Sequence, residues 1–117
     1  MALSNLFKNV DNIGTYQTGE IIFSEGSPGD VMFVVLEGEV EVQVNHKTVD
    51  IITAGNIFGE MALIDAGSRS ATAIAKTGCK LALVDQKKFL YMVQQTPYFS
   101  LEVMRVLADR LRYMNSK

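Results

Sequence analysis

The most constraining feature of this 117-residue chain is a strict alternation of polar and apolar residues over positions 39–44, Glu-Val-Glu-Val-Gln-Val. Successive side chains of an extended strand point to opposite faces, so three valines share one face and three polar groups share the other. A strand of this kind buries one face against a core and leaves the other in water, as in antiparallel sheets. The segment therefore predicts a β protein with half-buried strands.

Similar strand patterns follow one another along most of the chain, about eight residues apart. Glycine-containing turns separate them at residues 18–19, 26–30, 37–38 and 54–55. The expected strands span residues 16–17, 20–23, 31–36, 39–44, 49–52, 71–76 and 80–84. Many short strands joined in this way favour a mainly β fold, a β-sandwich or jelly-roll barrel, over about residues 14–85.

Both ends of the chain change to the periodicity of helices. Residues 2–10 carry apolar residues at i, i+3, i+4 and i+7, which predicts a short N-terminal helix that packs on the rest. Residues 86–115 are expected to form two C-terminal helices, because Asp85 is a favourable N-cap and Pro97 interrupts the apolar pattern.

The last of these helices has two apolar stripes. One consists of Met104, Leu107, Leu111 and Met114, and the other includes Val103 and Val106. Two stripes indicate two contacts, one with the barrel and one with a partner. A second copy of the same helix, and hence a homodimer, is the preferred interpretation.

Composition excludes several classes of protein. Apolar residues make up 48% and charged residues 21% of the chain, as in ordinary globular proteins, and the length fits a single domain over residues 1–117. A net charge of −2 and a pI near 5.3 argue against a nucleic-acid surface. No apolar run approaches the roughly 18 residues of a membrane span. The single Cys79 excludes an internal disulfide and fits a reducing compartment, so a cytoplasmic location is expected.

The clearest functional motif covers residues 55–73, G-N-I-F-G-E-M-A-L-I-D-A-G-S-R-S-A-T-A. Gly59 allows the backbone to approach a ligand, and the N–H groups of a short helix after it favour an anion. Arg69 follows the returning loop and carries a planar fork that suits phosphate oxygens. Glu60 fits beside an anion if it accepts a hydrogen bond from a neutral group such as a sugar hydroxyl. Together these residues predict a cradle for a ribose that carries a phosphodiester.

This motif closely resembles the phosphate-binding cassette of cyclic nucleotide-binding domains. That family includes the bacterial catabolite activator protein, the regulatory subunits of cyclic-AMP-dependent protein kinase and cyclic-nucleotide-gated channels. A second, glycine-rich similarity lies upstream at residues 26–30 and 36–40, and the resemblance extends from about Thr15 to the C-terminus. It implies a jelly-roll sensor domain with cyclic AMP or cyclic GMP as ligand and no cofactor.

The resemblance also implies a set of ligand-binding residues. Arg69 would pair with the phosphate oxygens, and Glu60 would take the ribose 2′-hydroxyl. Ser70 could bond the phosphate, and Val42 and Val49 would flank the base, although ordinary core positions are an equally good interpretation of the two valines. The remaining members of the implied set are Phe58, Gly59, Met61, Ala62, Ala71, Arg110, Tyr113 and Asn115.

The base-binding end departs from the family pattern. Arg110 matches an arginine that bacterial activators direct at the purine, but Met114 stands where a hydroxyl residue is expected. Asn115 could bond a purine edge, or Tyr113 could stack on it. The choice between cyclic AMP and cyclic GMP therefore stays open.

Catalysis finds little support in the sequence. The one histidine, His46, falls in an expected hairpin turn, and neither an acid–base pair nor a metal-ligand set is evident. This count also disfavours a cupin enzyme, the jelly-roll rival. No second helix-turn-helix segment is present, so no nucleic-acid contact is expected within the chain. The preferred hypothesis is a non-enzymatic sensor that couples nucleotide binding to movement of the last helix; the alternative is a nucleotide-independent interaction module on the same fold.

Overall fold

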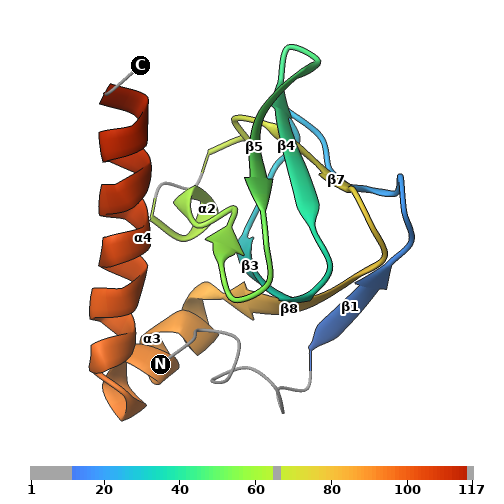
Figure 1. Cartoon of the computed structure of the whole chain (residues 1–117). Coiled ribbons are helices and arrows are strands. Elements are labelled where there is room, and N and C mark those ends of the chain that lie inside the picture. Colours follow the sequence, from blue (N-terminus) through green and yellow to red (C-terminus); the bar gives the residue numbers. More distant parts are fainter. Residues whose placement is uncertain (1–11, 65–66, 116–117) are drawn as a thin grey trace.

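The computed structural model describes residues 12–64 and 67–115, in which two antiparallel sheets enclose a core and helices lie along one side (Figure 1). The sheets have the strand orders β1-β8-β3-β6 and β2-β7-β4-β5. The expected mainly β sandwich is confirmed, whereas the expected N-terminal helix lies outside the described residues. The strands are β1 (Ile13–Tyr16), β2 (Ile21–Phe23), β3 (Val31–Glu37), β4 (Val40–Val44), β5 (Lys47–Ile52), β6 (Ile57–Phe58), β7 (Thr72–Ala75) and β8 (Cys79–Asp85). The helices are α2 (Met61–Ile64), α3 (Gln86–Gln95) and α4 (Tyr98–Asn115).

The β3 strand explains how one sheet serves two cores. Phe33 and Val35 face the interior between the sheets, where they meet residues such as Val40 and Ala73 of the other sheet. Met32 and Val34 point the opposite way, into a second core that the helices close. Because both faces of β3 are covered, its sequence is apolar from Val31 to Leu36 instead of alternating.

Two helical residues close the second core. Phe99 and Val103 of α4 are 0% and 4% exposed and pack against Met32, Val34 and Ile57 of the first sheet. This burial holds the N-terminal half of α4 against the sandwich, and the helix then continues alongside α2 (Figure 1).

The junction between β8 and α3 lies where the sequence predicted a helix N-cap. Asp85 ends the strand and caps the helix, its carboxylate accepting a hydrogen bond of 2.7 Å from the backbone N–H of Lys88. The backbone N–H of Thr96 bonds to the carbonyl of Met92, and α4 begins directly after Pro97. The predicted N-cap and the predicted break are both found.

The β6 strand was missed in the sequence. It has two residues, Ile57 and Phe58, and pairs with Val34 and Phe33 of β3. A pair of apolar residues has no periodicity, so only its long-range partner identifies it as a strand. Its consequence is functional, since β6 delivers the chain into the Gly59–Glu60 turn.

Candidate functional site

The turn at Gly59 starts the candidate site. Gly59 has φ +73, a left-handed conformation that favours glycine, and a Cβ added there would lie 2.8 Å from Nη1 of Arg69. The N–H groups of Ala62 and Leu63 bond back to the carbonyls of Gly59 and Glu60, at 3.3 and 3.1 Å. The α2 helix that follows has four residues. It is therefore too short for a substantial dipole, and local N–H groups, more than the expected helix dipole, are what this turn can offer an anion.

Arg69 is buried beside this turn, with 8% of its surface exposed. Its Nη1 donates to the carbonyl of Gly59 at 3.0 Å and its Nη2 to the carbonyl of Val31 at 2.7 Å. Burial lowers the pKa of Arg69, and the negative charges of Asp30 and Glu60 oppose that shift. The group nevertheless stays cationic at neutral pH, because the ordinary pKa of arginine is far above 7. The site thus contains a buried positive charge bonded to neutral carbonyls.

The backbone of Arg69 is fixed by the loop between β2 and β3. Its N–H donates to the carbonyl of Ser27 at 2.7 Å, and its own carbonyl accepts from Gly26 at 2.8 Å. The glycine-rich similarity at residues 26–30 and the cassette are therefore two sides of one structure. The sequence placed them in the same family pattern but gave no sign that they touch.

Glu60 and Arg110 come together across 50 residues of chain. Arg110 Nη1 forms an ion pair with Glu60 Oε1, and Nη2 donates to the carbonyl of Ile57. Glu60 is 8% exposed, so its carboxylate is a buried charge with a cationic partner. Arg110 was expected to contact the purine base of a ligand. In the structure its guanidinium instead binds the carboxylate of Glu60, which was expected to accept a hydrogen bond from the ribose.

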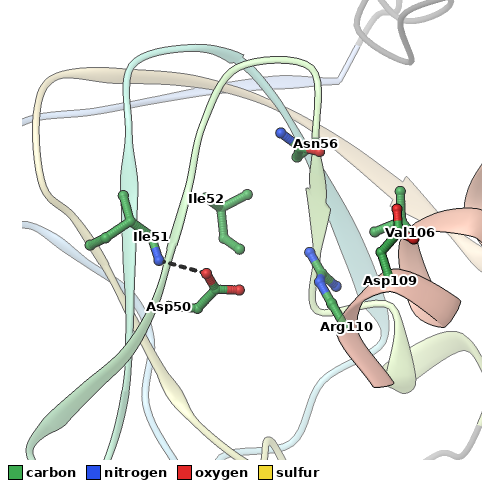
Figure 2. Close-up of a pocket in the computed structure, with 7 residues that line it drawn as sticks. All are labelled: Asp50, Ile51, Ile52, Asn56, Val106, Asp109 and Arg110. Carbon is green, nitrogen blue, oxygen red and sulfur yellow. Dashed lines mark hydrogen bonds between the residues drawn. The ribbon is translucent and has the colours of Figure 1, made fainter. Parts of the chain in front are cut away.

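A pocket of about 210 Å³ lies between β5 and α4 (Figure 2). The side chains of Ile52 and Val106 come from opposite walls, and Arg110 lies on the helical wall. Sequence reasoning found Arg110 but missed the others, because the walls meet only when α4 docks on the sandwich. The lining residues are Asp50, Ile51, Ile52, Asn56, Val106, Asp109 and Arg110.

The other candidate residues differ in what they can contribute. Phe58 is 3% exposed and its ring stacks on Phe33, with centroids 4.9 Å apart, so only its backbone could reach a ligand. Val42 is half-buried, whereas Val49 is 46% exposed on β5. The side chains of Tyr113 and Asn115 lie outside the described part. Met61 and Ser70 are exposed, and Ala62 and Ala71 are half-buried.

The described ranges, 12–64 and 67–115, also bear on other kinds of site. Within them no group of three or more His, Cys, Asp and Glu side chains is placed to hold a metal ion. None of the helices described there has the length and apolar character needed to cross a membrane. His46 lies with Asn45 in the turn between β4 and β5, with φ 65 and 52.

Comparison with known proteins identifies the family. The model of the cyclic nucleotide-binding domain matches residues 13–96. The chain belongs to this family. The predicted family and fold are thereby confirmed, and the matched residues contain both Glu60 and Arg69.

Several relatives of this cyclic nucleotide-binding domain carry the names of receptors or regulators. The cyclic AMP receptor protein of Thermus thermophilus is 31% identical over 102 residues, which cover 83% of this chain and 47% of that protein. The cAMP-dependent protein kinase regulatory subunit of Schizosaccharomyces pombe is 43% identical over 75 residues, 63% of this chain and 18% of that one. The crystal structure of Thermus thermophilus catabolite activator protein has a TM-score of 0.81 at 29% identity, over 89% of this chain and 51% of that chain. The chain spans about half the length of the bacterial relatives it matches.

Proposed function

We propose that the chain is a regulatory sensor that binds a cyclic nucleotide, with cyclic AMP the first candidate and cyclic GMP the second, and does not turn it over. The observation that carries this proposal is Arg69. Its side chain is buried, and its Nε has no hydrogen-bond partner in the described structure. A buried charge with an unused donor is costly unless an anion completes it, and a cyclic phosphate supplies one negative charge.

The neighbouring groups fit the rest of such a ligand. Glu60 lies within the same turn and would accept a hydrogen bond from the ribose 2′-hydroxyl. Backbone N–H groups of residues 59–61 and the hydroxyl of Ser70 would bind phosphate oxygens, with the small side chains of Ala62 and Ala71 leaving room for them. The base would enter the region between β5 and α4, and Val42, Val49, Tyr113 and Asn115 stay the predicted contacts of the base.

Arg110 connects this ligand to the helix. Its ion pair with Glu60 occupies the carboxylate that the ribose hydroxyl would approach. A bound nucleotide would therefore compete with, or reorganise, a contact that holds the C-terminal half of α4. Ligand binding would shift the equilibrium between two positions of α4. The size of the shift is set by how much more tightly the nucleotide binds one position than the other.

The names of relatives support the nucleotide and its regulatory use. They include a cyclic AMP receptor protein and a protein kinase regulatory subunit. A solved structure described as "Sp-2Cl-cAMPS bound to PKAR CBD2" is similar with a TM-score of 0.65 at 27% identity, over 92% of this chain and 84% of that one. Such regulators and the single reduced Cys79 favour a cytoplasmic location.

The outer side of α4 exposes apolar side chains that could bind a partner, which we propose is a second copy of the chain. Leu101, Met104 and Leu111 are 45%, 53% and 60% exposed at spacings of three and seven residues. Leu107, which was expected on the same stripe, instead packs against the core. A homodimer through this face would dissociate on Leu111→Glu and not on Arg112→Glu, as measured by sedimentation velocity.

Calorimetry tests the function. Cyclic AMP and cyclic GMP, titrated separately into the purified chain, are expected to bind at micromolar concentrations or below. Arg69→Gln is expected to weaken binding by at least about 100-fold, because two charge-assisted hydrogen bonds contribute about 3 kcal/mol or more. Arg112→Gln is the matched control, since its side chain is 79% exposed.

Two outcomes would contradict the proposal. Absence of heat, together with an unchanged melting temperature at millimolar nucleotide, would favour the interaction module, for which the exposed face of α4 is the candidate surface. Formation of 5′-AMP during incubation with cyclic AMP and divalent metal ions would show that the chain is an enzyme.

A further inference from the structure

The guanidinium of Arg69 is stacked on an aromatic ring. Its Cζ lies 4.2 Å from the ring centroid of Phe23, the last residue of β2, and 5.7 Å from that of Phe33. A planar cation at this distance from a ring face is attracted to it, more strongly when both are removed from water. The contact joins a strand at the edge of one sheet to the cassette.

The Phe23 ring is itself held in place. Its centroid lies 5.8 Å from that of Phe33 and 5.9 Å from that of Phe58, and those two rings stack on each other. Three rings that support one another leave little freedom for any one of them. The surface under Arg69 is therefore rigid.

Gly29 closes the other side of Arg69. A Cβ built on Gly29 would overlap Nε and Cζ of the arginine, so any larger residue there would have to displace the guanidinium. Gly29 has no left-handed φ that would require glycine. The requirement at this position is thus space for the guanidinium, not backbone conformation.

We propose that Phe23 and Gly29 are positioning residues that form a slot for the guanidinium of Arg69 and so orient it for a phosphate. This inference rests on the proposed function, because the phosphate is the group that the oriented cation would bind. Two edges of the guanidinium are taken by the carbonyls of Gly59 and Val31, and the slot fixes its plane. The arginine then loses little conformational freedom when the ligand binds. A lysine has no plane to stack and would not be held in this way.

The slot explains a feature of the chain that the ligand alone does not. The loop between β2 and β3 and the Phe23 ring lie in the first part of the sequence, far from Arg69 along the chain. They contact Arg69 through the Phe23 ring, Gly29 and the backbone of residues 26 and 27. Their role is to prepare Arg69, and their loss should act through it.

The first test compares Phe23→Leu with Phe33→Leu. Both variants lose a ring from the same cluster, but Phe23→Leu removes the close contact with Arg69 at 4.2 Å, whereas Phe33→Leu removes only the more distant contact at 5.7 Å. Phe23→Leu is expected to weaken cyclic nucleotide binding by about 3- to 30-fold, the range of a cation–π contact. Phe33→Leu is expected to change the affinity by less than about 3-fold while destabilising the fold to a similar extent.

A double-mutant cycle separates positioning from general destabilisation. Arg69→Lys is expected to weaken binding strongly in the wild-type background and by at least about 3-fold less in the Phe23→Leu background, where the slot is already lost. A purely structural role for Phe23 predicts that the two losses multiply. Multiplying losses, or equal effects of Phe23→Leu and Phe33→Leu, would overturn the positioning role while leaving nucleotide binding intact.

Gly29→Ala provides an independent test if the phenylalanine variants fold poorly. The added methyl group must displace Arg69, so binding is expected to weaken by at least about 10-fold. Gly78→Ala is the matched control, because a Cβ there meets no atom closer than 4.0 Å. Equal affinities of the two alanine variants would overturn the slot. If the wild-type chain binds neither nucleotide, the proposed function itself fails, and this inference fails with it.

Discussion

The two arginines of the site are held in different ways. Arg69 belongs to the sandwich and is held by it through two carbonyls, an aromatic ring and a glycine-rich loop, with Nε left for a ligand. Arg110 belongs to α4 and reaches the sandwich through one carboxylate and one carbonyl. The first is held within the sandwich, whereas the second is a contact between the sandwich and the helix that packs on it.

This difference indicates which half of the site can respond to a ligand. Contacts around Arg69 depend on strand pairing, which a small molecule cannot easily change. The contact of Arg110 depends on where α4 lies, and α4 is anchored by Phe99 and Val103 near its start. A ligand at Glu60 would therefore act on the C-terminal half of the helix while the sandwich stays as it is.

The largest loss of folding stability is expected where Phe99 packs α4 against the sandwich. Phe99→Ala removes a fully buried ring and is expected to lower the free energy of unfolding by about 3–5 kcal/mol. Leu101→Ala, in the same helical turn and 45% exposed, should lower it by less than about 1 kcal/mol. Urea unfolding measures both. Equal losses would mean that α4 is not anchored where its N-terminal half meets the sandwich.

A smaller loss of folding stability is expected when the ion pair between Glu60 and Arg110 is broken. Arg110→Met leaves the buried carboxylate of Glu60 without its partner and should lower the free energy of unfolding by about 1–3 kcal/mol. Hydrogen exchange should accelerate in the C-terminal half of α4 and not in β3 or β8.

The control for the ion pair is a second substitution. Adding Glu60→Gln to Arg110→Met removes the buried charge and should recover part of the lost stability. Arg112→Met, on the exposed side of the same helix, should change little. If the strands exchange as fast as α4 in Arg110→Met, the sandwich and the helix are a single cooperative unit.

The contrast between the two regions also explains what the sequence could predict. Strand alternation and glycine turns predicted the sandwich, and the Asp85 cap and Pro97 predicted the helices, because these signals are local. Gly59, Glu60 and Arg69 could be predicted as site residues because they lie in one short motif. Each of these predictions depends on residues that are neighbours in the sequence.

What the sequence did not predict depends on contacts between distant segments. The slot around Arg69 needs Phe23 and Gly29, and no spacing relates them to the cassette. The pocket between β5 and α4 exists only because Val106 and Ile52 face each other after the helix docks. The Glu60–Arg110 pair joins groups for which separate ligand contacts were expected. Such contacts are consequences of packing, and local patterns do not contain them.

At the junction of β8 and α3, loss of the helix N-cap is expected to lower the free energy of unfolding by about 1 kcal/mol. Asp85→Ala removes the N-cap of α3, whose carboxylate satisfies the N–H of Lys88. Lys87→Ala, in the first turn of the same helix and exposed, should have a smaller effect. Thermal unfolding compares the two variants. An unchanged melting temperature for Asp85→Ala would show that packing, not the cap, fixes where α3 begins.

The smallest effect concerns acid stability of the β4–β5 hairpin, which belongs to the sandwich alone. Hydrogen bonds from Thr48 and Gln43 lower the pKa of Glu41, with a weaker contribution from the charge of Lys76, and burial opposes them. A lowered pKa in the folded state stabilises the fold above the unfolded value, near 4.5, and this contribution disappears as the pH falls through the folded value.

Glu41→Gln should therefore flatten the wild-type loss of stability below about pH 4.5, and the two proteins should differ by a constant amount above about pH 5.5. Thr48→Ala removes the strongest donor and should reduce the acid-dependent loss in the same direction while keeping the carboxylate. Urea unfolding at a series of pH values measures the three profiles. Because Glu41 accepts hydrogen bonds from Gln43 within β4 and from Thr48 of β5, and from no residue of α4 in these bonds, hydrogen exchange in α4 should be the same in all three proteins at neutral pH. Altered hydrogen exchange in α4 would show that a change in the sandwich reaches the helix, so the sandwich would be less rigid than its contacts with Arg69 imply. The Arg69 and Arg110 halves of the site would then differ in rigidity only by degree.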